Sequence, residues 1–577
     1  MDFPKGHIMK PSSLVAVSLM LLGFCAHLGA IDLIERPTKG RQYETLRFRF
    51  VENLGFQNPF DLQTNHVELL IQQPDFSKRV FSFFYDGLNK DSVEQWEARF
   101  TPKQAGLHRF TVRINGKVHT QFELPVGENE GKKQGGLKLS GRNGAFEYES
   151  GEAFRGFGLN VCWAQDYEYY FKKMQAAGMN ITRIWMCPWH LSIEWQETGL
   201  GRYNLGSVRR LDAILQLADK YGIYVILCMD YHGIARKGMG YFRENRWPVN
   251  PYNTINGGPC VDGAELFTNA EAKKFFKKKY KYIVSRFGHS SRIAAWEFLN
   301  ETDLMAGKSI PVNRWHIEMA EYIKSIDVHE RLVTTSSTRS FPEKVVDAFR
   351  SPAMDFVMFH EYNKLDMAPY ITDLHEAAIE YYQKPIVVGE FGVEYRGGDR
   401  TFKVDSQHVG LHNGIWSGWF SETPIMPLSW WWDNYIDRHD LWREYASLSR
   451  FAESMDFNAK HLVFKTLPAG HREADPQRQV PCMVRCIYSA DRCAIWLKNE
   501  EYQWSLVSEG KEPTEMGAFS QPIPDLVPGR YSIAWYDPQT GKYFEKTSEA
   551  EVKVDGMLLL SVPSFSKDLA CLVKRLQ

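Results

Sequence analysis

Hydrophobic and polar residues follow three successive patterns along the chain. Residues 31–128 hold short apolar runs rich in β-branched and aromatic residues, such as Leu46–Val51 and residues 110–114, with turn residues between them. Asn115 and Gly116 directly follow one of these runs and form a dipeptide typical of a tight β-hairpin. This spacing predicts an N-terminal Ig-like β-sandwich domain.

Strand-like and helix-like segments alternate between residues 145 and 455. Residues 207–221 carry their apolar side chains on one helical face, and Gly222 is a suitable end for that helix. Thr268 and Glu271 have the spacing of a capping box that opens another helix. Eight nearly continuous apolar runs lie between such helices: residues 155–159, 181–186, 224–229, 293–299, 332–335, 356–359, 386–388 and 426–429. Because strands buried on both faces have this composition, the pattern predicts an α/β fold, a (β/α)8 TIM barrel.

A doubly wound sheet is the alternative for this region, but no Gly-rich phosphate-binding loop follows the first apolar run. Residues 456–577 return to short β-like runs, which predict a C-terminal β-sandwich domain. Residues 129–144, between the first domain and the barrel, include a polar, Gly-rich stretch and are predicted to be a linker.

The first 30 residues have the pattern of a cleavable signal peptide. Lys5 and Lys10 precede a short apolar run at residues 14–24, and small residues up to Ala30 offer a cleavage site. We therefore expect a secreted or periplasmic protein. Eight of the nine Cys lie beyond this segment. They could pair after export, but several end apolar runs where Cys serves as a small buried hydrophobe, so we expect a structural role.

Composition excludes some partners. The 69 Lys and Arg against 70 Asp and Glu leave no basic excess to neutralise a nucleic acid, and no second apolar run reaches membrane-spanning length. No His-x-His pair ends a predicted strand and no dense Asp/His cluster appears, so neither a metal nor another cofactor is expected. The 17 Trp fit either a sugar-binding cleft or a large core. Nothing in the sequence sets an oligomeric state.

Candidate chemistry lies where the predicted strands end, because (β/α)8 barrels place their active sites at the carboxyl ends of the strands. Glu301 and Glu390 follow two strands that stand three apart around the barrel, so their side chains can face each other across its mouth. Two opposed carboxylates suit the cleavage of a glycosidic bond, since one protonates the leaving oxygen and the other acts at the anomeric carbon. The substrate partner is therefore expected to be a carbohydrate.

The segments around these two acids resemble a known family. Trp296-Glu297-Phe298-Leu299-Asn300-Glu301 and Val387-Val388-Gly389-Glu390-Phe391-Gly392 are similar to the two signature strand ends of glycoside hydrolase clan A, whose nearest well-known members are family 5 cellulases and mannanases. The resemblance covers residues 145–455. Other residues also fall where that clan places its subsite residues: Arg183, His232, His360, Tyr362 and a Trp in the last strand.

The resemblance implies a retaining β-glycoside hydrolase acting on a β-linked oligo- or polysaccharide. Glu301 matches the acid/base, Glu390 the nucleophile, and Asn300 the residue that binds the sugar 2-hydroxyl. These roles are chemically reasonable, because Arg183 beside Glu390 would lower the pKa of that carboxyl, and Tyr362 could donate to it. Glu301 instead requires a raised pKa, so that it is protonated before cleavage.

Further residues have weaker signals. Trp163 follows the first predicted strand, and of three consecutive Trp we expect Trp430 to face the sugar, because alternation along a strand prevents all three from doing so. Glu297 lies inside a buried strand and is expected to pair with a cation. The Lys run at residues 273–281 is expected to be a solvated helix face.

A non-catalytic carbohydrate-binding or cell-surface protein with a glycosidase-like barrel is the alternative function. The presence of both Glu301 and Glu390 favours the hydrolase, since a barrel that only binds sugar does not need two carboxylates.

Overall fold

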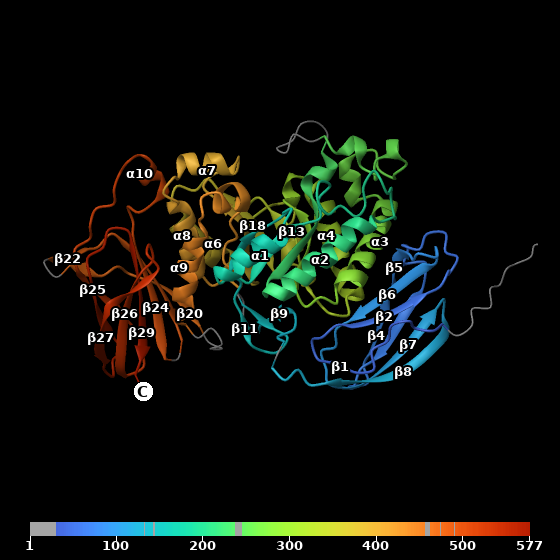
Figure 1. The fold of residues 1–577 in the computed structure, drawn as a ribbon. Coiled ribbons are helices and arrows are strands. Elements are labelled where there is room, and N and C mark those ends of the chain that lie inside the picture. The colour runs from blue at the N-terminus through green and yellow to red at the C-terminus, as the bar shows by residue number, and fades with distance from the viewer. Residues whose placement is uncertain are drawn as a thin grey trace, which may run out of the picture.

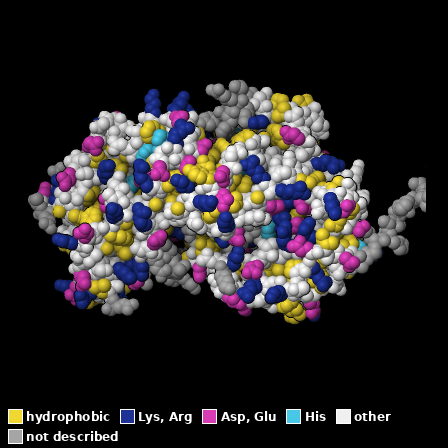
Figure 2. Space-filling view, viewed as in Figure 1, with side chains coloured by type: hydrophobic (Ala, Val, Ile, Leu, Met, Phe, Trp, Pro, Cys, Tyr) yellow, Lys and Arg dark blue, Asp and Glu magenta, His cyan; other side chains and the backbone are white. Residues whose placement is uncertain are grey.

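The computed structural model describes residues 31–131, 133–141, 145–236, 245–455, 462–472, 475–489 and 491–576. The predicted signal peptide, residues 1–30, lies outside the described residues. Three units lie in a row in Figure 1, with a strand-rich unit (blue) on one side of a helix-covered barrel and a second strand-rich unit (red) on the other. Within the described residues, no helix is both long and apolar enough to cross a membrane. On the face shown in Figure 2, basic and acidic side chains are interspersed.

The N-terminal unit consists of two sheets that pack face to face. Their strand orders are β1-β8-β7-β3-β4 and β2-β6-β5. The strands are β1 (Gly40–Arg41), β2 (Leu46–Val51), β3 (Val67–Gln72), β4 (Lys78–Ser82), β5 (Phe84–Leu88), β6 (Glu94–Phe100), β7 (Gly106–Ile114) and β8 (Lys117–Gly127). Alternate residues of β2 point inward, and the ring of Phe48 lies 5.0 Å from that of Phe110 on the opposite sheet. This unit contacts the barrel through buried ion pairs: Arg99 binds Asp212 at 2.6 Å.

The central unit is a TIM barrel of parallel strands. These are β12 (Gly158–Asn160), β13 (Ile181–Trp185), β14 (Tyr224–Tyr231), β15 (Ile293–Asn300), β16 (Leu332–Thr334), β17 (Ser336–Ser337), β18 (Val357–Tyr362) and β19 (Ile386–Gly392). The short strands β16 and β17 together take the fifth position in the ring, since β16 pairs with β15 and β17 with β18. Almost every residue in them is buried, as expected for strands covered on both faces. The main helices around them are α1 (Tyr167–Ala176), α2 (Leu205–Tyr221), α3 (Ala270–Phe287), α4 (Ser309–Ile326), α5 (Val346–Arg350), α6 (Met367–Tyr382), α7 (Gly398–Val404), α8 (Val409–Trp419) and α9 (Trp442–Ala452).

The eighth predicted strand, residues 426–429, closes the ring without forming a regular strand. Isolated bridges join Ser429 to Leu159 on one side and to Phe391 on the other. Pro427 interrupts this segment, and because proline has no N–H it cannot donate a ladder hydrogen bond. The side-chain amide of Asn160 reinforces the closure by donating to the carbonyls of Gly389, at 3.0 Å, and Ser429, at 3.1 Å.

The structure corrects the predicted linker. Within residues 129–144, Leu137–Leu139 forms strand β9, which pairs with β10 (Phe146–Tyr148), and β10 in turn pairs with β11 (Ala153–Phe154). This small sheet packs on the amino-terminal ends of the barrel strands. A three-residue strand is too short to show alternation of apolar and polar residues in the sequence. The polar, Gly-rich stretch before it therefore led to the prediction of a linker for the whole segment.

Two expectations about helices are also corrected, while the predicted stop at Gly222 is confirmed by its left-handed φ of 72°. The N-cap of α3 is Asn269, whose side chain accepts from the backbone N–H of Glu271 at 2.9 Å, and not Thr268. Lys279 is not on a solvated face, because its ammonium is buried and binds Asp230 at 2.9 Å. A carboxylate buried beside the barrel requires such a counterion.

The C-terminal unit also consists of two layers, with strand orders β20-β23-β24-β29-β26-β27 and β22-β21-β25-β28. The strands are β20 (Val463–Leu467), β21 (His471–Arg472), β22 (Asp475–Gln479), β23 (Cys482–Tyr488), β24 (Arg492–Asn499), β25 (Phe519–Ile523), β26 (Gly529–Asp537), β27 (Lys542–Val552), β28 (Leu558–Val562) and β29 (Asp568–Arg575), with one short helix, α10 (Trp504–Ser508). The eight cysteines within the described residues are buried, in agreement with a structural role.

A buried charged cluster joins this unit to the barrel. His412 of α8 lies 2.8 Å from Asp568 of β29 and 3.0 Å from Glu444 of α9. Burial opposes the charged imidazolium, but the two carboxylates outweigh it and raise the pKa of His412 to about 10. Trp496 also donates to Asp568, at 2.9 Å, so the cluster fixes the position of both elements.

We predict that His412→Gln removes a pH-dependent part of the stability. Because the folded-state pKa of His412 lies above the ordinary 6.5, the stabilisation is fully present below about pH 6.5 and is lost as the pH rises towards about 10. The variant should lose roughly 3–5 kcal/mol near neutral pH and little near pH 10, as measured by denaturant unfolding across this range. His375→Gln is the matched control, since burial lowers the pKa of His375 to about 4 and it stays neutral throughout. A wild-type pH dependence in His412→Gln would contradict the prediction.

Candidate active site

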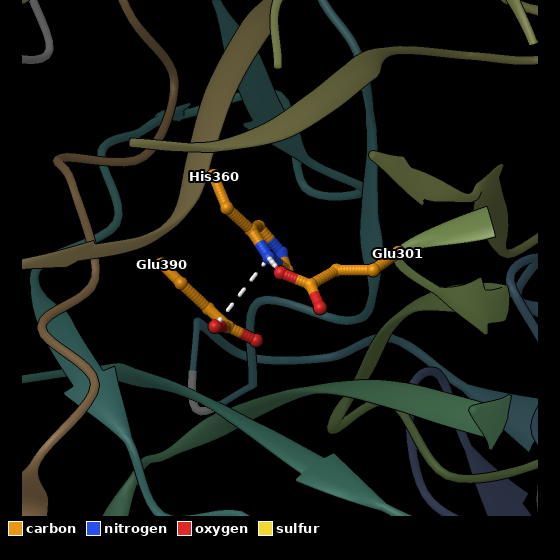
Figure 3. A group of neighbouring side chains, drawn as sticks. All are labelled: Glu301, His360 and Glu390. Carbon is orange, nitrogen blue, oxygen red and sulfur yellow. Dashed lines mark hydrogen bonds and ion pairs between the residues drawn. The ribbon is translucent and has the colours of Figure 1, made fainter. Parts of the chain in front are cut away.

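Glu301 and Glu390 converge at the carboxyl ends of their strands, as predicted. Glu301 follows β15 with a left-handed backbone, φ 50° and ψ 54°, which is strained for a residue with a side chain. Glu390 lies within β19. Figure 3 shows the ring of His360, from β18, between the two carboxylates, with its Nδ1 3.0 Å from Glu301 and 3.4 Å from Glu390. One ligand atom from each of the three side chains lies within 4.8 Å of the others.

Arg183 and Tyr362 hold the carboxylate of Glu390. Nη1 of Arg183 donates to Glu390 Oε1 at 2.7 Å, and the hydroxyl of Tyr362 donates to Oε2 at 2.8 Å. Arg183 is completely buried, and its Nε and Nη2 form a two-point contact with Glu297 at 2.6 and 2.7 Å. The expected pairing of Glu297 with a cation is therefore confirmed.

Asn300 and His232 lie on the Glu301 side of the site. Nη2 of Arg183 donates to the amide oxygen of Asn300 at 2.7 Å, which directs the amide nitrogen towards His232, 3.4 Å away. His232 Nδ1 lies 3.5 Å from Glu301. The six predicted side chains Arg183, His232, Asn300, His360, Tyr362 and Trp430 therefore lie close to the two glutamates.

A cavity of about 480 Å³ opens above the glutamates. Trp430 lines it, as expected, whereas Trp431 donates to the carbonyl of Glu394 and Trp432 packs on Trp163. Trp163 was predicted to bind substrate but is not among the residues that line this cavity. Its ring packs edge-on against four other indoles, at 5.0–5.5 Å: Trp185, Trp189, Trp430 and Trp432. Its place after the first strand puts it in the layer that supports Trp430.

Sequence reasoning missed several residues that line the cavity. They are Arg236, Leu304, Thr338, Arg339, Ser340, Glu361, Asn363, Lys364, Tyr370 and Tyr395. Many of them follow a strand by a few residues, for example Lys364 after β18 and Arg339 after β17. The rule that barrel chemistry follows the strand ends would have found these two if applied beyond the first residue of each loop.

Burial dominates the electrostatics of the two acids. It raises the pKa of Glu301, with His232 opposing the shift, and it also raises the pKa of Glu390, with His360 and Arg183 opposing it. Arg183 acts to lower the pKa of Glu390, as expected, but burial outweighs it in the net shift, because the site is buried more deeply than a strand end in the sequence suggests. Burial also lowers the pKa of His360 to about 4, so this ring is neutral near neutral pH.

The spacing of Glu301, His360 and Glu390 is compatible with a metal ion in size. Its charge environment is not favourable, because the Arg183 guanidinium already lies 2.7 Å from Glu390 and would repel a cation there. The arrangement suits acid–base and nucleophilic chemistry by two carboxyl groups.

Comparison with known proteins also relates this chain to enzymes that use two carboxyl groups. Residues 148–435 match the family described as cellulase (glycosyl hydrolase family 5). Among similar sequences, mannan endo-1,4-beta-mannosidase F of Aspergillus fumigatus is 25% identical over 278 residues, covering 42% of this chain and 58% of that protein. Mannan endo-1,4-beta-mannosidase 5 of Solanum lycopersicum is 26% identical over 318 residues, covering 47% of this chain and 73% of that protein.

One solved structure shares the fold over most of the chain. It is a candidate glycoside hydrolase from Bacteroides vulgatus ATCC 8482, with a TM-score of 0.64 and 14% identity, covering 94% of this chain and all of that one. The chain spans 58% of the length of the Aspergillus fumigatus relative, so the match to that sequence concerns part of both proteins.

We predict that Arg183→Met destabilises the protein in a pH-dependent way. Without the guanidinium, the already raised pKa of Glu390 rises further. A buried acid with a raised pKa lowers the free energy of unfolding only at pH values above its pKa in the unfolded chain, where unfolding lets it ionise. The loss should be roughly 3–5 kcal/mol at about pH 8 and smaller at about pH 4, measured by denaturant unfolding. Adding Glu390→Gln should restore part of the stability, because it removes the unpaired charge. Wild-type stability of Arg183→Met at about pH 8 would contradict the analysis.

Proposed function

Because this chain is a clan A, family 5-like protein, we propose that it is a retaining β-glycoside hydrolase that cleaves β-linked oligo- or polysaccharides by double displacement. The observation that carries the proposal is the closeness of the two acids, with one oxygen of each within 4.8 Å. Retaining enzymes hold their carboxyl groups about 5–5.5 Å apart, whereas inverting enzymes need about 6.5–9.5 Å to admit a water molecule.

In the first step, a carboxylate oxygen of Glu390 attacks the anomeric carbon and forms a glycosyl ester. The bond from that carbon to the glycosidic oxygen breaks, and the leaving oxygen takes the proton of Glu301. Because its pKa is raised, Glu301 is able to hold this proton until the bond breaks. Arg183 and Tyr362 stabilise the negative charge of Glu390. In the second step, ionised Glu301 removes a proton from water, which attacks the same carbon and releases Glu390.

His360 serves both steps as a neutral donor. Its Nδ1 faces both carboxylates, while its Nε2 has no polar partner among the described residues, so the ring proton belongs on Nδ1. One N–H can serve only one carboxylate fully at a time. In the structure it lies closer to Glu301, at 3.0 Å, than to Glu390, at 3.4 Å, and a small shift of the ring lets it donate to either carboxylate.

Asn300 is suited to bind the sugar next to the cleaved bond. Arg183 occupies its amide oxygen and holds the amide nitrogen beside His232, as a fixed donor for a sugar hydroxyl. Trp430 offers an apolar ring to a sugar face in the same cavity. The relatives named above act on mannan, so β-1,4-mannan is the first substrate to test. The leader-like segment at residues 1–30 supports export as part of the proposal.

We predict that Glu301→Gln and Glu390→Gln each reduce kcat on the substrate by at least about 10³-fold while leaving the fold intact. Each change removes an acidic group that the reaction uses but keeps the side-chain shape. Glu194→Gln is the matched control, since Glu194 is also buried in the barrel but contacts Tyr252 and Gly201 rather than the site. Sugar binding without turnover by the wild-type protein would favour the non-catalytic alternative.

The stereochemistry of the product is a second prediction. Direct attack by Glu390 inverts the anomeric carbon once and hydrolysis inverts it again, so a β-linked substrate gives a β product first. Proton NMR during early turnover should show the β anomer, with the α anomer appearing later by mutarotation. An α product appearing first would mean an inverting mechanism and would contradict the roles given to the two glutamates.

A further inference from the structure

We propose that Ser336 is a positioning residue that couples the two glutamates through one hydroxyl, an inference that rests on the proposed function. Ser336 lies in the two-residue strand β17 and is completely buried. Its Oγ accepts the backbone N–H of Glu301 at 3.0 Å and lies 2.7 Å from Oε1 of Glu297. A serine hydroxyl has one proton, and the charged oxygen of Glu297 is its nearest acceptor, so the proton points there.

On the Glu301 side, this hydroxyl supports a strained backbone. The left-handed conformation of Glu301 turns its side chain from the strand end towards His360 and Glu390. A buried N–H without an acceptor is costly, and the hydroxyl of Ser336 is the acceptor for this one. Losing it should let the chain at residue 301 relax away from the position that the acid/base needs.

On the Glu390 side, the same hydroxyl acts through two further groups. Glu297 receives Ser336 and Arg183 Nη2 on one oxygen and Arg183 Nε on the other, which fixes the plane of the guanidinium. With that plane fixed, Nη1 is directed at Glu390 Oε1. The run of contacts Glu301–Ser336–Glu297–Arg183–Glu390 thus connects the acid/base to the nucleophile beneath the cavity floor.

The test compares Ser336→Ala with Ser337→Ala, the adjacent buried serine, whose hydroxyl donates to the carbonyl of Arg339 and touches neither glutamate. We expect Ser336→Ala to lower kcat about 10- to 100-fold with KM changed less than about twofold, because the fold of the cavity is retained. The acidic limb of the pH–rate profile should move to higher pH, since Arg183 supports ionised Glu390 less well. Ser337→Ala should leave kcat and the profile unchanged.

Two further variants separate positioning from packing. Ser336→Thr keeps the hydroxyl and should recover most of kcat and the wild-type profile, even if the added methyl group lowers the melting temperature. Glu297→Gln weakens the contacts that fix the guanidinium, so it should also lower kcat, and its effect should not add fully to that of Ser336→Ala.

The outcomes distinguish this inference from the proposed function. No turnover by the wild-type protein on β-linked glycans would overturn both. Turnover that is lost in Glu301→Gln and Glu390→Gln but unchanged, in rate and pH profile, in folded Ser336→Ala would overturn the positioning role alone. If Ser336→Ala does not fold, a rate loss in folded Ser336→Thr as large as that in Glu297→Gln would overturn it, because Ser336→Thr retains the hydroxyl.

Discussion

The buried guanidinium of Arg183 is the interaction on which the site depends. It is completely enclosed and donates to Glu297, Asn300 and Glu390 at 2.6–2.7 Å. An unpaired charge in this position would be very unfavourable, so the guanidinium and its partners have to be assembled together when the barrel closes. The planar fork of arginine fixes the direction of each contact, which a lysine could not do. The orientation of three strand ends is therefore determined by one side chain.

The two glutamates differ in function because their neighbours differ. Burial acts on both in the same direction, but Glu390 receives a guanidinium and a phenol, whereas Glu301 has two histidines beside it. The guanidinium of Arg183 and the hydroxyl of Tyr362 favour the ionised form of Glu390. The neutral ring of His360 beside Glu301 stabilises an ionised carboxylate less, so Glu301 is protonated more easily. His360 lies between them and can donate to either. Two identical side chains can then act as nucleophile and acid in one reaction cycle.

The flanking units stabilise the barrel from opposite sides. The N-terminal unit meets α2 and α3 through the ion pairs Arg99–Asp212 and Arg286–Asp86, and the C-terminal unit meets α8 through His412–Asp568. Neither set of contacts includes the residues of the active site. These buried charged clusters hold each junction in place, because breaking a contact would leave a buried charge unpaired.

The sequence alone determined much of this protein. The apolar runs predicted the TIM barrel, and the residues following them predicted Glu301, Glu390, Arg183 and Trp430 in one site, because in a barrel the strand order in the chain is also the order around the ring. Only the tertiary structure decided contacts that join distant segments or depend on depth. Trp163 supports the site rather than lining the cavity, Lys279 is buried against Asp230, and burial outweighs Arg183 at Glu390. The periodicity of apolar residues shows which face of a helix or strand is buried. The distance between two side chains that are far apart in the sequence, and the removal of water from around a charged group, are set only when the chain folds.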